Sequence, residues 1–171
     1  RDVAFEIVDP LRSPQAGMTL RDVQLSLVPQ KSPSAGPVTY TLQGTGSGDH
    51  FEKLEFEGSF VRGFGTWSIS GAVEGLEFTP RLRGALPTEC DRWLEPLASI
   101  RGRTQFGFRV TQPAAESPQH ANPPLDFRIV GDVSEGRIDD NRLPEPLTDV
   151  SAHVEADVQG LRIERLQARC G

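Results

Sequence analysis

The chain has 171 residues, 36% hydrophobic and 25% charged, which suits one globular domain and excludes a disordered chain. A net charge of −6 leaves no basic face for neutralising phosphates, so nucleic acid is excluded as a partner. The 17 glycines and 14 prolines are too many for a helical protein and indicate short strands separated by turns.

Alternating apolar residues predict a series of strands in the first half of the chain. We expect strands over residues 3–8, 18–28, 38–42 and 51–60, followed by a hairpin of residues 65–73 and 76–83. The turn of that hairpin would be Glu74-Gly75, because glycine supplies the positive φ of a tight turn.

One segment in the middle of the chain departs from the β pattern. Thr88 to Asp91 resembles a capping box, and Trp93, Leu94 and Leu97 follow at helical spacing. The sequence therefore predicts a short helix over residues 88–98. A strand over residues 106–110 and an irregular loop over 111–124, which holds four prolines, come next.

The last 47 residues carry the clearest pattern. A strand is expected over 125–129, and an extended linker over 142–147 leads to strict two-residue alternation over 150–158. Gln159-Gly160 is predicted to form a hairpin turn before a return strand. Apolar residues change parity after Ile163, which predicts a β-bulge at Glu164-Arg165.

A short pattern, apolar-x-x-apolar-x-apolar, recurs at residues 20–25, 51–56 and 163–168, and residues 73–78 resemble residues 158–163. These similarities favour internal repetition within one domain over 1–171, with sub-repeats 1–84 and 104–171 around the short helix. The alternative is a meander whose hairpins look alike because turn chemistry is alike.

Motifs for chemistry are weak. The glycines of residues 44–48 precede a strand rather than a helix, so they do not form a phosphate loop. The acidic residues of 132–141 fit turns better than a calcium loop, and the histidines are expected at the surface without metal spacing: His50, His120 and His153. We therefore expect that the protein is not an enzyme and that it binds no metal and no cofactor.

The two cysteines, Cys90 and Cys170, are too few for a disulfide framework. A buried thiol at Cys170 is favoured over a single cross-link. No apolar stretch reaches the roughly 20 residues of a membrane-spanning helix, and no signal peptide opens the chain. Because the chain begins at Arg1 without a methionine, we expect a fragment of a longer repeat protein.

Nearly every predicted strand has one apolar and one polar side. The expected fold is mainly β: an antiparallel meander of hairpin repeats that forms an open, curved sheet or groove, with one short helix. The alternative is a closed β-sandwich, in which the apolar sides cover one another.

Over residues 125–171, the Leu143-Pro144-Glu145-Pro146-Leu147 linker, the following strand, the tight turn and the return strand near Gly171 resemble the AsmA-like and TamB-like repeat family of Gram-negative envelopes. The resemblance implies a section of an envelope-spanning hydrophobic β-groove that holds or conducts phospholipid acyl chains between the inner and outer membranes. It implies a periplasmic location, a parent protein anchored in the inner membrane, and no catalytic residue.

The resemblance also implies two partners: a phospholipid or other acyl lipid, and flanking repeats of the same chain. An acyl chain needs a row of apolar side chains rather than directional contacts. The candidate lipid-facing residues are Phe106, Phe108, Leu125, Phe127, Ile129, Val154, Ala156, Leu161 and Ile163. In the alternative they fill a sandwich core, and the protein is an adhesion, carbohydrate-binding or assembly module.

Overall fold

The computed structural model describes residues 5–9, 16–30, 37–63, 65–85, 99–113 and 124–170. These residues form nine strands and one short helix. The strands are β1 (Phe5–Asp9), β2 (Ala16–Gln30), β3 (Thr39–Gly48), β4 (Phe51–Val61), β5 (Trp67–Phe78), β6 (Ile100–Gln112), β7 (Asp126–Ile138), β8 (Leu147–Asp157) and β9 (Gly160–Cys170). The helix α1 (Pro80–Ala85) follows β5.

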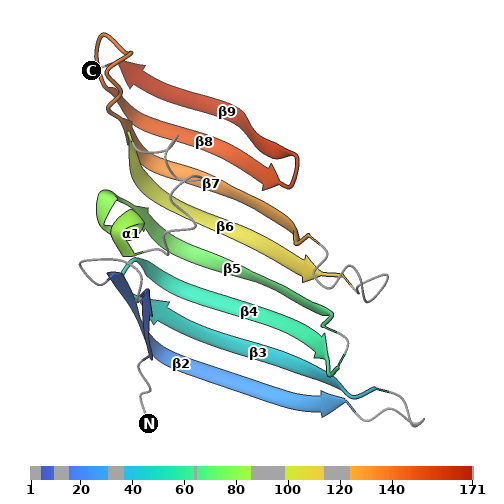
Figure 1. Cartoon of the computed structure of the whole chain (residues 1–171). Coiled ribbons are helices and arrows are strands. Elements are labelled where there is room, and N and C mark those ends of the chain that lie inside the picture. Colours follow the sequence, from blue (N-terminus) through green and yellow to red (C-terminus); the bar gives the residue numbers. More distant parts are fainter. Residues whose placement is uncertain are drawn as a thin grey trace.

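The strands make one antiparallel sheet in which each strand pairs with its neighbours in sequence, from β1 to β9. Within the described residues the sheet is open, because β1 and β9 are its two edges and do not pair with each other. Figure 1 shows the strands following one another across a single curved layer. The predicted antiparallel meander with an open sheet is confirmed, and the described residues do not form the closed sandwich.

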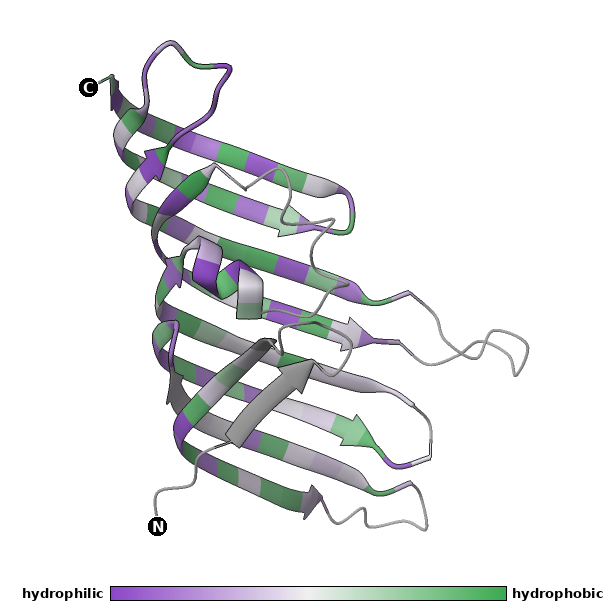
Figure 2. Cartoon of the chain, turned by 60° about the vertical axis from the view of Figure 1, so that its left-hand side comes forward, coloured by the Kyte–Doolittle hydropathy of each residue, from purple (hydrophilic) through white to green (hydrophobic). Residues whose placement is uncertain are grey.

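Alternation along the strands gives the sheet an apolar face and a polar face, and Figure 2 shows the two kinds of residue alternating. Residues directly opposite in register share a face, so they form rows across the strands. One row, here called the central row, crosses eight strands of the apolar face: Leu25, Gly44, Phe56, Gly71, Phe108, Ile129, Ala156 and Leu161. On the polar face, an adjacent row contains Gln43, Glu57, Ser70, Arg109, Arg128 and Asp157.

Several strands carry a β-bulge whose residue has positive φ: Asp22 (53°), Gly75 (64°), Glu135 (51°), Asp149 (50°) and Arg165 (51°). Each coincides with a register shift in its strand. The bulge predicted at Glu164-Arg165 is therefore confirmed. Each bulge residue follows an apolar residue by two positions. Because the bulge adds one residue to its strand, the residue three positions after that apolar residue returns to the same face.

The bulges explain one error of sequence interpretation. Glu74-Gly75 is not a hairpin turn, because β5 continues through it to Phe78 and only the register with β6 shifts there. The segment predicted as the return strand, 76–83, instead contains the end of β5 and the start of α1. The Thr79 hydroxyl caps this helix by accepting a hydrogen bond from the Leu82 N–H at 3.2 Å.

The helix predicted over 88–98 lies outside the described residues, and so does Cys90. Cys170 is exposed on the edge strand β9, so the predicted buried thiol is wrong; no strand covers that edge among the described residues. The prediction that His50 lies at the surface is also wrong. His50 is 6% exposed, and its backbone carbonyl accepts a hydrogen bond from the Glu77 N–H.

Two connections differ in detail from the prediction. The β8–β9 turn consists of Val158 and Gln159, one residue earlier than expected, because the Asp157 carboxylate accepts a hydrogen bond from the Gln159 N–H at 2.7 Å. The linker before β8 begins with a β-turn rather than in extended form, since the Leu143 N–H donates to the Asp140 carbonyl at 3.0 Å.

Among the described residues, few hydrophobic side chains are buried, and they belong to α1 and β8. Leu82 of α1 is 3% exposed, Val150 in the β8 bulge is 3% exposed, and Ala152 is 9% exposed. The helix contacts β2 and β5. Among the described residues no side chain is completely buried, so most of the sheet is a single layer rather than half of a packed core.

Candidate functional site

The structure brings most of the sequence-predicted residues into register on the apolar face. Phe108, Ile129, Ala156 and Leu161 lie directly opposite one another across β6 to β9 in the central row. Beside them, a second row contains Phe106, Gly131, Val154 and Ile163. Phe127 faces Val110 in a third row, and Leu125 lies immediately before β7.

The apolar face continues into the first half of the chain, where sequence reasoning named no candidate. The central row runs on through Gly71, Phe56 and Gly44 to Leu25. The alternation of residues 51–60 was the signal for this half. Glycines obscured it, because a glycine on the apolar face reads as a gap in an apolar pattern.

These glycines give aromatic rings room to lie along the sheet. A Cβ atom added to Gly71 would lie 2.8 Å from Cζ of Phe108, and one added to Gly44 would lie 2.6 Å from Cε1 of Phe56. Each ring therefore covers a glycine of the preceding strand in sequence, an arrangement that protects the backbone there.

The apolar face is exposed at its two sides and partly exposed in its middle, at Phe56, Phe108 and Ile129. Leu25 is 61% exposed at one side, and Leu161 and Ile163 are 54% and 52% exposed at the other. With adjacent strands about 4.8 Å apart, the central row is about 34 Å long. An exposed apolar surface of this continuity is typical of a binding surface.

An apolar hollow of about 520 Å³ lies beside the turn between β4 and β5. Leu42, Phe60, Trp67 and Ile69 line it, and all four belong to the apolar face by register. The ring of Phe60 stacks on Tyr40 with centroids 5.0 Å apart. Arg62, in the turn, also lines the hollow.

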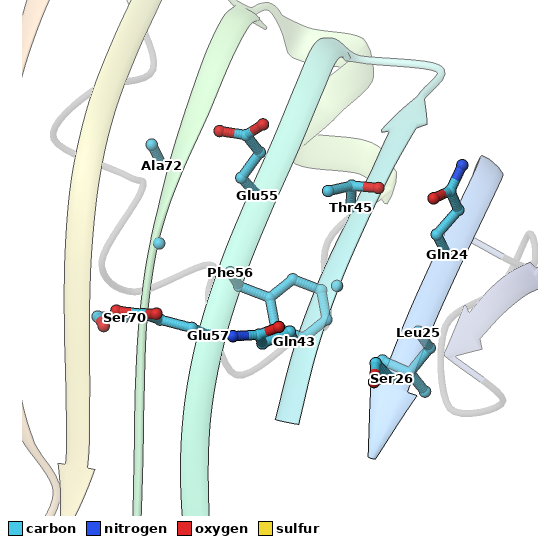
Figure 3. A pocket seen from close by; sticks show the side chains of 12 residues that line it. Gln24, Leu25, Ser26, Gln43, Thr45, Glu55, Phe56, Glu57, Ser70 and Ala72 are labelled. Atoms are coloured by element: carbon cyan, nitrogen blue, oxygen red, sulfur yellow. The ribbon is translucent and has the colours of Figure 1, made fainter. Parts of the chain in front are cut away.

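A second hollow, of about 620 Å³, lies over β2 to β5. Figure 3 shows polar side chains around it in two rows, Gln24, Thr45 and Glu55 in one and Ser26, Gln43, Glu57 and Ser70 in the other, with Phe56 between them. Polar and apolar groups therefore both line this hollow, whereas the lining of the one beside Trp67 is almost entirely apolar.

Many charged side chains are paired with one another. Near the bulged strand ends, Arg142 donates to Asp140 at 2.7 Å and Arg137 to Asp139 at 3.0 Å, and these hydrogen bonds hold the pKa of both carboxyls below the usual range. On the polar face, His153 lies 2.9 Å from Asp132. Opposite charges therefore lie next to each other in the two arginine pairs.

Among the described residues, no group of three or more His, Cys, Asp or Glu side chains is placed to hold a metal ion. No helix in the part of the chain that the structure describes is long and apolar enough to span a bilayer. Comparison of the chain with protein-family models, with curated proteins and with solved structures finds no match. The functional argument therefore depends on the apolar face itself.

Proposed function

We propose that this chain is a section of a hydrophobic β-groove that holds or conducts phospholipid acyl chains between the inner and outer membranes. One observation carries the proposal: a continuous apolar face, about 34 Å long, is left uncovered by the described residues of an open sheet. In this proposal the section lies in the periplasm and belongs to a parent protein anchored in the inner membrane.

The dimensions and chemistry of the face suit an acyl chain. Burying a methylene group contributes roughly 0.8 kcal/mol and requires no directional contact, so a row of apolar side chains is sufficient. The hydrocarbon core of a bilayer is about 30 Å thick, and one acyl chain spans half of it. An acyl chain is therefore shorter than the central row. Chains can therefore lie along the row, across the strands.

The open edges favour flanking repeats of the same chain as the second partner. An edge strand presents unpaired backbone groups that invite pairing with another strand. On β9, the apolar side chains of Leu161, Ile163 and Leu166 are all more than half exposed. A following repeat that paired with β9 would continue both the sheet and its apolar face, as the resemblance to AsmA-like and TamB-like proteins implies.

The geometry supports less well the alternative module, a closed sandwich for adhesion, carbohydrate binding or assembly. It requires the candidate residues to fill a core between two sheets. The described strands form one sheet, in which Leu161 and Ile163 are exposed. We therefore retain the groove as the function that the geometry supports best.

A double substitution tests the proposal. Replacing Phe108 and Phe127 by Asp places two charges on the apolar face, where they cannot remain solvated beneath an acyl chain. We expect uptake of a fluorescent phospholipid from vesicles to fall at least tenfold, measured after the vesicles are removed by centrifugation.

The matched control replaces Ser68 and Ser70 by Asp. Both residues lie on the polar face of β5, so the charge change is equal but the apolar face is intact. Circular dichroism establishes that each variant is folded. If the folded Phe108 and Phe127 variant takes up as much lipid as the control variant, the groove assignment is wrong.

A further inference from the structure

The hollow beside Trp67 has an unusual pairing of surfaces: apolar walls and one cationic side chain. Leu42, Phe60, Trp67 and Ile69 supply the walls, and Arg62 lines the hollow from the β4–β5 turn. An apolar wall alone does not distinguish one amphiphile from another. A charge beside it discriminates between head groups, because opposite charges attract most strongly near apolar surroundings.

The turn positions the backbone of Arg62. The Arg62 N–H donates to the Val38 carbonyl at 3.1 Å, which ties the turn to the start of β3. Gly63 and Gly65, with φ of 87° and 64°, provide the positive-φ positions of the turn. A backbone hydrogen bond therefore holds Arg62 at the start of the turn, and its side chain is exposed.

Arg62 has no carboxylate partner among the described residues, whereas other arginines do: Arg21 pairs with Asp49, Arg103 with Glu52 and Arg142 with Asp140. Arg62 is also exposed and adds almost no polar surface to the hollow, so its charge is available to a head group outside the apolar walls. In a chain of net charge −6, an unpaired cation beside an apolar hollow matches a molecule with an anionic head and an apolar tail.

The hollow opens onto the rest of the apolar face. Leu42 and Ile69 belong to the third row, which continues through Val110 to Phe127. A ligand whose head lies at Arg62 can therefore extend its chain along the apolar rows.

We infer that Arg62 and the hollow beside Trp67 form a head-group site that selects anionic phospholipids over zwitterionic ones. This inference rests on the proposed function and specifies its substrate: the Arg62 guanidinium binds the lipid phosphate region, and the acyl chain lies against Phe60 and Trp67. The same charge on the polar face, for example that of Arg109, has no such effect because it lies across the sheet from the apolar rows.

The experiment uses the full chain carrying Trp93→Phe, so that Trp67 is the single tryptophan. Phosphatidylglycerol and phosphatidylcholine with identical brominated chains are offered in separate vesicles, which are then removed. Trp67 fluorescence reports whether a chain lies in the hollow, because bromine quenches at short range. We expect both lipids to quench Trp67, with an apparent affinity about fivefold higher for phosphatidylglycerol.

Three further variants separate the explanations. Arg62→Gln should remove the preference while leaving phosphatidylcholine binding unchanged, and Arg62→Lys should restore most of it. Arg109→Gln, which makes the same change in net charge on the polar face, should keep the preference. The inference is overturned if Arg62→Gln retains the preference, if Arg109→Gln loses it equally, or if inorganic phosphate displaces the lipid completely.

Failure of this inference is distinguishable from failure of the proposed function. If the Trp93→Phe protein bound both lipids equally, the proposal of a head-group site would be wrong and the proposal of a groove would stand. If neither lipid binds to folded protein, the groove and the head-group site are both wrong.

Discussion

At the residue scale, glycines opposite aromatic rings shape the apolar face. Gly71 has no room for a side chain, since an added Cβ would lie 2.8 Å from the Phe108 ring and would also meet the Glu55 carbonyl oxygen. Gly107, on the neighbouring strand and the other face, has ordinary space, because its nearest atom would be 3.7 Å away. The two positions therefore form a matched pair for the same substitution.

We predict that Gly71→Ala destabilises the protein by about 1–3 kcal/mol, because the ring and backbone must shift. Gly107→Ala should be neutral or stabilising by up to about 1 kcal/mol, since it restricts the unfolded chain without a clash. Urea denaturation monitored by circular dichroism measures both. Equal effects of the two substitutions would show that the ring-over-glycine contact does not constrain the sheet.

At the scale of the element, the bulges give the sequence pattern its meaning. Glu135 occupies a bulge of β7 with a φ of 51°, a conformation that glycine adopts easily and a β-branched residue resists. We predict that Glu135→Gly stabilises the protein and Glu135→Val destabilises it, each by about 1 kcal/mol. Thermal unfolding of the purified variants checks both signs.

The control for the bulge is Arg128, an exposed residue of the same strand in regular register with β6 and β8. There the order should reverse, with valine favoured over glycine, because extended backbone suits β-branched side chains. The same order at both positions would mean that the bulge conformation has no energetic consequence.

The elements also show what the sequence could predict. Alternation located most strands, and the change of parity after Ile163 located a bulge, because both follow from a period of two residues. Glu74-Gly75 was misassigned because a glycine with positive φ serves a turn and a bulge equally well. Only the pairing of Val73 with Phe106 and of Leu76 with Thr104 separates the two cases, and pairing is not local information.

The candidate site was predictable in part for the same reason. Residues of β6 to β9 were assigned to one face by parity, and their register confirms a shared face. The hollow beside Trp67 was not predicted, because it depends on Leu42, Phe60 and Ile69 meeting across three strands. Arg62 carries no sequence signal of its own, since a single arginine in a turn is common on any surface.

At the scale of the whole molecule, the chain exposes more surface than a compact protein of its size. Its accessible area is 12153 Å², whereas a compact monomer of the same 18.7 kDa mass would expose roughly 8,300 Å². The open sheet contributes to this difference, because its apolar face lacks a second layer among the described residues. Bound lipid and flanking repeats would cover this face and its edges.

The most direct test of the groove is mass spectrometry of organic extracts from this chain, purified from a bacterial periplasm. A closed β-sandwich protein prepared in the same way provides the control for adventitious lipid. The account predicts phospholipid in the extract of this chain and none in the control. An extract without lipid from well-folded protein would contradict the claim that the apolar face holds acyl chains.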